Sequence, residues 1–139
     1  MAAAGAISQL FKQSMRPAAR AAIAKKPDCF ATVTATLNNT HVCFARLNGE
    51  VIAHTSAGMT GRKGPQRQEG DGAREAARRA AAKAVAAGHR IAHLRFKGRS
   101  RGRSAALQGV MSADMKVSHL EDITAFPTNG CRARKARRL

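Results

Sequence analysis

The sequence predicts an α/β fold: a single domain with a mixed five-stranded sheet, which starts as an antiparallel meander and continues as βαβαβ, and with two helices. Five short runs alternate between apolar and polar residues; turn residues separate the first three runs, and helical stretches separate the last three. The length of 139 residues suits one such domain with short basic arms. Right-handed crossovers are expected to place one helix on each face of the sheet.

The meander is expected first along the chain. In residues 29–37 apolar side chains alternate with phenylalanine and threonine, which is typical of a strand. Residues 38–40 supply turn residues, and residues 41–47 then return as the second strand. Asn48-Gly49 is a strong hairpin signal. The third strand therefore covers residues 50–56.

Residues 57–72 contain five glycines, a proline and several basic residues, and we expect no packed element there. A loop of this length in a compact domain is usually functional, because its backbone N–H groups need water or a ligand. Asp71 is then expected to cap a helix over residues 73–87 that stops at Gly88. Alanines line one side of this helix, so it can lie close to a sheet.

The remaining elements alternate strand and helix. A fourth strand is expected over residues 91–97, followed by a basic turn that contains two glycines. A second helix is expected over about residues 104–113, and a fifth strand over residues 116–124. The folded domain is thus expected to cover residues 27–127.

Both ends of the chain are basic. Residues 1–26 are rich in alanine, contain no acid and place apolar residues at helical spacing, which is typical of an organellar presequence, here a retained one. A basic RNA-binding arm is the alternative for this segment. Residues 128–139 hold five basic residues and no acid, and they predict a tail that orders on phosphate.

The charge points to a polyanionic partner. The chain has 25 Lys and Arg against 8 Asp and Glu, a formal net charge of +17. A nucleic acid is the simplest partner, and a membrane surface is the weaker alternative, since no stretch approaches the roughly 18 apolar residues of a transmembrane helix. The absence of Trp and Tyr argues against modules that stack bases on aromatic side chains, so phosphate and shape contacts should dominate.

The sequence carries no signature of an enzyme or a metal site. The three cysteines form no C-x-x-C pair, and neither a Walker A nor a G-x-G-x-x-G motif occurs. The acids are scattered, and no nucleophile elbow appears. We therefore expect a non-enzyme without cofactor or metal.

A series of short strings occurs in order between Pro27 and Leu139, and each is weak alone. The strings are Thr36-Leu37-Asn38-Asn39-Thr40, Ser56-Ala57-Gly58, Lys63-Gly64, Lys97-Gly98, Gly102-Arg103, Asp122-Ile123-Thr124, Pro127 and Asn129-Gly130-Cys131-Arg132. Together they resemble the small-subunit ribosomal protein S11 family. The resemblance implies a ribonuclease-H-like fold without nuclease activity and a place on the platform of the small ribosomal subunit near the mRNA exit path. It also implies contacts with small-subunit rRNA and with neighbouring ribosomal proteins.

By the same resemblance, four segments are the implied RNA contacts, and all four stand out in the sequence itself. Their residues are Asn38, Asn39 and Thr40; Ser56, Arg62 and Lys63; Lys97, Gly98, Arg99, Arg101 and Arg103; and Asn129, Gly130, Arg132, Arg134, Lys135, Arg137 and Arg138. The family usually has Pro-Gly-Pro where this chain has Arg99-Ser100-Arg101, and a proline pair at Ala133-Arg134. We expect phosphate contacts of the added arginines to replace part of the preorganised turn geometry.

The sequence thus predicts a structural, rRNA-binding constituent of a small ribosomal subunit. The compartment is expected to be the mitochondrion, with a plastid or the bacterial cytoplasm as alternatives. The alternative function is a free-standing, non-specific RNA-binding chaperone or regulator. In either case base readout should be minor.

Overall fold

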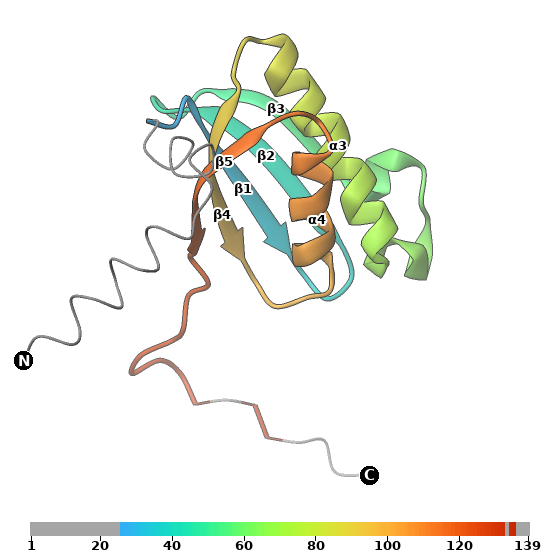
Figure 1. Ribbon diagram of the computed structural model, residues 1–139. Coiled ribbons are helices and arrows are strands. Elements are labelled where there is room, and N and C mark those ends of the chain that lie inside the picture. Colours follow the sequence, from blue (N-terminus) through green and yellow to red (C-terminus); the bar gives the residue numbers. More distant parts are fainter. Residues whose placement is uncertain (1–25, 133, 136–139) are drawn as a thin grey trace, which may run out of the picture.

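The computed structural model describes residues 26–132, 134 and 135 (Figure 1). Its strands are β1 (Cys29–Ala35), β2 (Thr40–Arg46), β3 (Val51–Ser56), β4 (Ile91–Lys97) and β5 (Lys116–Asp122). They form one sheet in the order β3-β2-β1-β4-β5. β2 is antiparallel to β1 and β3, whereas β4 is parallel to β1 and β5. This confirms the predicted single α/β domain, with a mixed five-stranded sheet that starts as an antiparallel meander and continues as βαβαβ.

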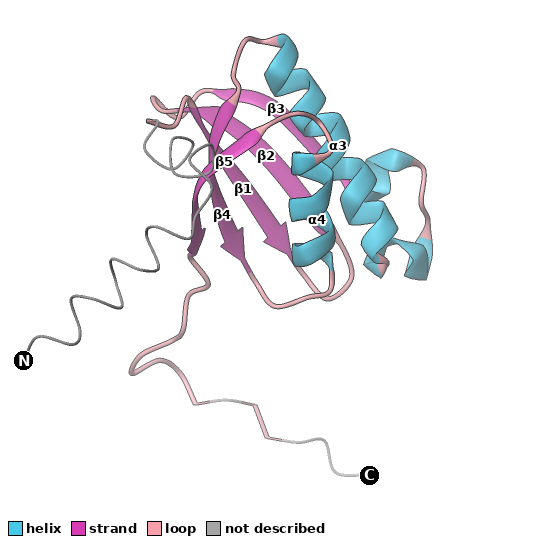
Figure 2. Cartoon of the chain, viewed as in Figure 1, coloured by secondary structure: helices cyan, strands magenta, loops and turns pink. Residues whose placement is uncertain are grey.

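Both long helices lie on one face of the sheet (Figure 2). They are α3 (Gly70–Ala86) and α4 (Gly102–Met111), and buried residues of both belong to the same core cluster. The expectation of one helix on each face is therefore wrong. The connections from β3 to β4 and from β4 to β5 advance in the same direction across the sheet. Right-handed crossovers in a common direction place both helices on the same side.

The segment after β3 is more ordered than the sequence predicts. It holds two 3₁₀ helices, η1 (Ala57–Thr60) and η2 (Gly64–Gln68), and α3 begins at Gly70. The Thr60 hydroxyl donates to the Ala57 carbonyl at 2.7 Å and closes η1, while Pro65 lies in the first turn of η2. Asp71 is not the cap of α3, because it lies in the first turn and Glu69 takes the cap position without a side-chain bond.

Other element boundaries also differ from the expected ones, most clearly those of β1, β5 and α4. β1 stops at Ala35 because the Thr36 N–H and hydroxyl both bond to the Asn39 carbonyl, which starts the turn early. β5 stops at Asp122, whose carboxylate accepts the Thr124 N–H. α4 begins at Gly102, two residues before the expected start, and ends at Met111.

The core lies between the sheet and the two helices and is built largely from small side chains. Phe44 and Leu94 are its largest fully buried side chains. α3 contributes only alanines and one glycine to its buried face. Alanine costs little conformational entropy on burial, and it lets the helix backbone approach the sheet.

Glycine is required where α3 and α4 cross. A Cβ at Gly109 would collide with the Arg74 carbonyl oxygen and would lie 2.9 Å from the Ala77 methyl group. Gly102 at the start of α4 is equally constrained, since a Cβ there would collide with the Thr40 hydroxyl. The β1–β2 turn therefore lies directly against the beginning of α4.

A closed ring of hydrogen bonds joins the end of β4, the start of α4 and the end of β5. The Gly98 N–H donates to the Thr124 hydroxyl (3.0 Å), which donates to Asp122 Oδ1 (2.6 Å). Arg103 closes the ring, because its Nη2 donates to Asp122 Oδ2 (2.7 Å) and its Nη1 to the Gly98 carbonyl (3.2 Å). We call these four residues, Gly98, Arg103, Asp122 and Thr124, the clasp. The clasp determines where the C-terminal tail leaves the sheet.

The face of the sheet opposite the helices is half-buried and mixed in character. Arg95 lies over the Phe30 ring at 4.0 Å from its centroid and pairs with Glu121 at 3.2 Å. His93 lies between Phe30 and His119, with both ring centroids 5.5 Å away. No helix among the described residues covers this face.

The crossing of α3 and α4 yields a stability prediction. Gly109→Ala should lower the free energy of unfolding by about 1–3 kcal/mol, because the added methyl group forces the helices apart. Gly58→Ala is the matched control, since its Cβ would meet only the flexible Arg67 side chain at 3.4 Å. Urea unfolding measures both variants. Equal midpoints for the two variants would show that the crossing tolerates a Cβ.

The clasp yields a prediction about pH. Hydrogen bonds from the Thr124 hydroxyl and N–H and from Arg103 lower the pKa of Asp122 from its ordinary 3.8 to about 2. Charged Asp122 therefore stabilises the fold fully above pH 3.8, and this contribution is lost as the pH falls through about 2. The difference in unfolding free energy between the wild type and Asp122→Asn should shrink over that window, measured by urea unfolding at stepped pH. A difference independent of pH contradicts the prediction, and Asp114→Asn is the control outside the clasp.

Candidate nucleic-acid interface

All four predicted RNA-contact segments leave or enter the sheet at the same edge (Figure 1). β1, β3, β4 and β5 run in one direction, so their carboxyl ends lie together, and β2 begins there. Both α3 and α4 also start at this edge, because each follows the carboxyl end of a strand. We call it the carboxyl edge. Ligands of open α/β sheets bind preferentially outside such an edge.

The β1–β2 turn presents only part of its predicted site. Asn38 is exposed, and its Oδ1 accepts a hydrogen bond from Gln68 Nε2 at 3.0 Å. Asn39 is half-buried and makes its hydrogen bonds within the turn: its N–H donates to the Thr36 hydroxyl, and its Oδ1 accepts the Thr40 N–H. Thr40 is buried against Gly102. Asn38 is thus the predicted residue of this turn that is open to a partner.

In the segment between β3 and α3, too, some of the predicted contact residues are buried or paired and others are exposed. Ser56 is buried at the end of β3, and Arg62 pairs with Glu69 at 2.9 Å. Lys63 is exposed. Arg67 is also exposed and donates to the Arg62 carbonyl, yet it is missing from the predicted contacts. The signal that could have added it is its place in the same glycine-rich basic segment.

The β4–α4 turn concentrates exposed positive charge. Lys97, Arg99 and Arg101 are exposed, and within the described part of the chain none of them lies within 4.0 Å of a carboxylate. They directly precede α4 in the chain, with Arg101 at its N-cap, and the first turn of α4 contains no acid. The N-terminus of a helix carries partial positive charge, so this turn attracts anions.

Two other predicted residues of this turn belong to the clasp. Gly98 has φ +94°, and a Cβ there would collide with the Ala35 carbonyl oxygen, so no other residue fits. Arg103 is held by Asp122 and lies over the Phe96 ring at 5.0 Å from its centroid. In this structure the Arg103 guanidinium therefore serves the fold.

The C-terminal tail extends away from the sheet after the clasp (Figure 1). Its predicted residues Asn129, Gly130, Arg132, Arg134 and Lys135 are all exposed. Asn129 adopts the left-handed conformation, with φ +50°. The predicted contacts at Arg137 and Arg138 lie outside the described residues.

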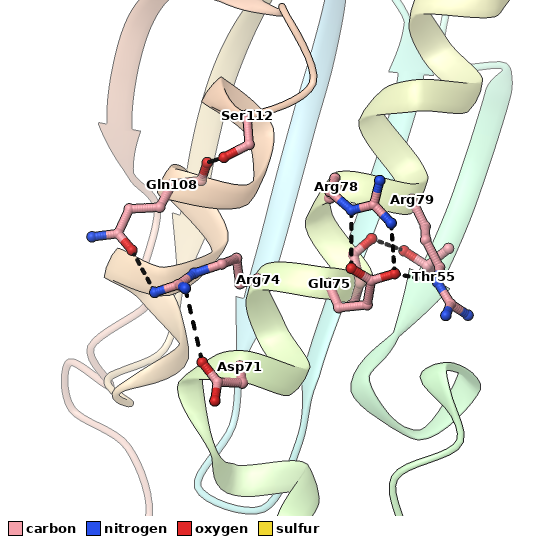
Figure 3. A network of polar contacts seen from close by, with 9 residues as sticks. Thr55, Asp71, Arg74, Glu75, Arg78, Arg79, Gln108 and Ser112 are labelled. Carbon is pink, nitrogen blue, oxygen red and sulfur yellow. Dashed lines mark hydrogen bonds and ion pairs between the residues drawn. The ribbon is translucent and has the colours of Figure 1, made fainter.

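The three arginines of α3 are already paired with polar side chains. On α3, Glu75 accepts two hydrogen bonds from Arg78, each 2.9 Å, and one from Arg79 at 2.7 Å (Figure 3). These bonds lower the pKa of Glu75 from 4.5 to about 2. Arg74 bonds to Gln108 of α4 and lies 3.9 Å from Asp71. Cations without a carboxylate partner therefore gather mainly at the carboxyl edge and along the tail.

The described residues give little support for a metal site, a membrane-spanning helix or a reactive cysteine. Within residues 26–132, 134 and 135, no three His, Cys, Asp or Glu side chains are grouped to hold a metal ion. In the same part of the chain, no helix has the length and apolar character to cross a membrane. Burial raises the pKa of the Cys29 thiol to about 11, which keeps it protonated and unreactive.

Comparison with known proteins agrees with this architecture. The family model described as "Ribosomal protein S11" matches residues 29–138. The chain is 35% identical over 128 residues to the small ribosomal subunit protein uS11c of Tupiella akineta, covering 92% of this chain and 98% of that relative. It is 38% identical over 116 residues to uS11 of Coxiella burnetii, covering 83% of this chain and 94% of the relative. It is 41% identical over 107 residues to uS11 of Nitratidesulfovibrio vulgaris, covering 77% of this chain and 83% of the relative.

The family model covers most of the chain, and the relatives align over nearly their whole length. The family consists of structural ribosomal proteins, which confirms the expectation of a non-enzyme. These matches confirm the resemblance seen in the sequence: the chain belongs to the ribosomal protein S11 family.

Proposed function

We propose that this chain is a structural constituent of the small ribosomal subunit that binds small-subunit rRNA with its carboxyl edge and tail, in the service of translation. The observation that carries the proposal is the grouping of unpaired Lys and Arg side chains at the edge where α3 and α4 begin, within the part of the chain that the structure describes. The names of the relatives, small ribosomal subunit proteins, support the same role.

Binding would rest on charge neutralisation and shape. The sheet and the clasp hold the turns in fixed relative positions, so the exposed arginines form a preset pattern for phosphates. Arginine can hold a phosphate through two parallel N–H bonds. The tail has no packing partner in the described structure, and it orders when RNA supplies the anions.

The resemblance to the family supports a finer position within the ribosome. We place the chain on the platform, near the mRNA exit path and beside other ribosomal proteins. The mitochondrion is the proposed compartment because residues 1–26 are basic, acid-free and amphipathic in pattern. The relatives named above are chloroplast and bacterial proteins, which support a ribosomal location in general. Residues 1–25 lie outside the described residues.

Sedimentation tests the ribosomal role. In an organelle-enriched lysate at low salt, the full chain should peak with the small ribosomal subunit, because its rRNA contacts hold it there. Mass spectrometry across a sucrose gradient detects the chain and the rRNA-associated proteins together. Recovery of the chain at the top of the gradient in low salt would overturn the proposal and favour the free-standing RNA chaperone.

The tail should contribute a measurable share of the salt dependence. Replacing Arg132, Arg134 and Lys135 together with Gln should flatten the plot of log Kobs against log salt, by roughly 0.7–0.9 for each phosphate that the variant no longer binds. The measurement is filter binding of the full chain to transcribed small-subunit rRNA over a KCl series.

A charge-matched control separates local contacts from net charge. Lys26, Arg90 and Lys116 are exposed and lie at the opposite, amino end of the sheet. Replacing these three with Gln lowers the charge of the chain equally, yet the slope should stay at the wild-type value. If the slope of log Kobs against log salt flattened equally in both triple variants, the tail would not be part of the interface.

A further inference from the structure

A cleft of about 700 Å³ opens at the carboxyl edge, where three of the four predicted RNA-contact segments meet. The β1–β2 turn, η2 and the β4–α4 turn form its walls. The side chains that define its chemistry are Leu37, Pro65, Gln68, Glu69, Arg99 and Arg101. Its volume lies in the range of small-molecule sites, about 300–1,000 Å³.

One part of the cleft is apolar and lies partly on a hydrogen-bonded turn. The Leu37 side chain is 78% exposed, the highest value among the exposed large hydrophobic side chains of the described residues. Hydrogen bonds hold the turn that carries it, because the Thr36 hydroxyl donates to the Asn39 carbonyl at 2.8 Å and accepts the Asn39 N–H at 3.1 Å. With exposed Pro65, Leu37 offers an apolar surface suited to the flat face of a base.

The polar walls of the cleft carry opposite charge. Arg99 and Arg101 have no carboxylate within 4.0 Å in the described part of the chain, so they are available to an anion. Glu69 lies on the η2 side and is held by Arg62 at 2.9 Å. Gln68 stands beside it, oriented by its bond to Asn38.

This pattern discriminates between possible ligands. A bare phosphate would be attracted to the arginines but repelled by Glu69. A paired duplex could bring only its backbone, since its bases are stacked inside. An unpaired nucleotide suits every wall, because its phosphate can bind the arginines, its base face can cover Leu37, and its amino or imino groups can donate to Glu69 or Gln68.

We propose that this cleft holds a single unpaired, extruded nucleotide of the bound RNA. Arg99 and Arg101 bind its phosphate, Leu37 and Pro65 contact its base, and Glu69 with Gln68 reads the base edge. The proposal rests on the proposed function and refines it, since it adds one position of base recognition to an interface otherwise based on phosphate and shape.

The test compares RNA hairpins that differ in one nucleotide. Four hairpins carry an unpaired A, C, G or U within the stem, with 2-aminopurine in place of A in a fluorescent version, and a fifth hairpin is fully paired. The full wild-type chain should bind at least one unpaired hairpin about fivefold or more tightly than the paired one. The 2-aminopurine fluorescence should rise on binding, because extrusion removes the stacking that quenches it.

Leu37→Ser should abolish this preference while leaving the affinity for the paired hairpin unchanged. Its exposure makes the substitution neutral for folding, which urea unfolding verifies. Leu47→Ser is the matched control: Leu47 is a 48% exposed leucine in the β2–β3 turn at the other end of the sheet, and its replacement should leave the preference intact.

The outcomes separate the two proposals. Failure of the wild type to bind any hairpin or small-subunit rRNA overturns the proposed function and the cleft with it. Equal wild-type affinity for paired and unpaired hairpins, or an equal fall in preference for Leu37→Ser and Leu47→Ser, overturns the nucleotide site alone and leaves the rRNA-binding role standing.

Discussion

The handedness of two crossover connections governs the rest of this structure. Both connections advance in the same direction across the sheet, so both helices lie on one face and must pack against each other as well as against the strands. Only very small side chains permit this double contact, which explains the alanines of α3 and the glycine at position 109. The same connections start both helices at the carboxyl edge, so the packing solution and the location of the candidate interface have one cause.

Charge is distributed according to this architecture. A chain with a net charge of +17 must either neutralise its cations or keep them apart. On α3 the arginines are satisfied by Glu75, Asp71 and Gln108. At the carboxyl edge the acids present serve local structure: Asp122 closes the clasp, and Glu69 holds Arg62. The cations left without a carboxylate partner there are Lys63 and Arg67, those of the β4–α4 turn and those of the described tail, and this residual charge favours binding of a polyanion over self-association.

The clasp also constrains the β4–α4 turn, which contains no proline. Arg99-Ser100-Arg101 therefore lack the rigidity that a proline would give the turn. The hydrogen bonds of Gly98 with Thr124 and Arg103 supply part of the missing constraint from inside the protein. Ser100 adds another, because its hydroxyl accepts the Gly102 N–H at 3.3 Å. The turn can therefore present Arg99 and Arg101 in a defined position although it contains no proline.

Period-two alternation, the Asn48-Gly49 turn and Gly88 after the first helix were enough to predict the sheet, its mixed pairing and both helices, because these signals depend on backbone geometry over a few residues. Basic composition and the ordered strings were enough to predict the family. Only the tertiary structure decided which face the helices cover, since a crossover's side depends on strand order. It also decided that Arg103 and Thr40 serve the fold while Leu37, Arg67 and Glu69 lie at the candidate interface. A side chain's partners come from residues distant in the chain, such as Asp122 for Arg103, and no local pattern encodes those distances.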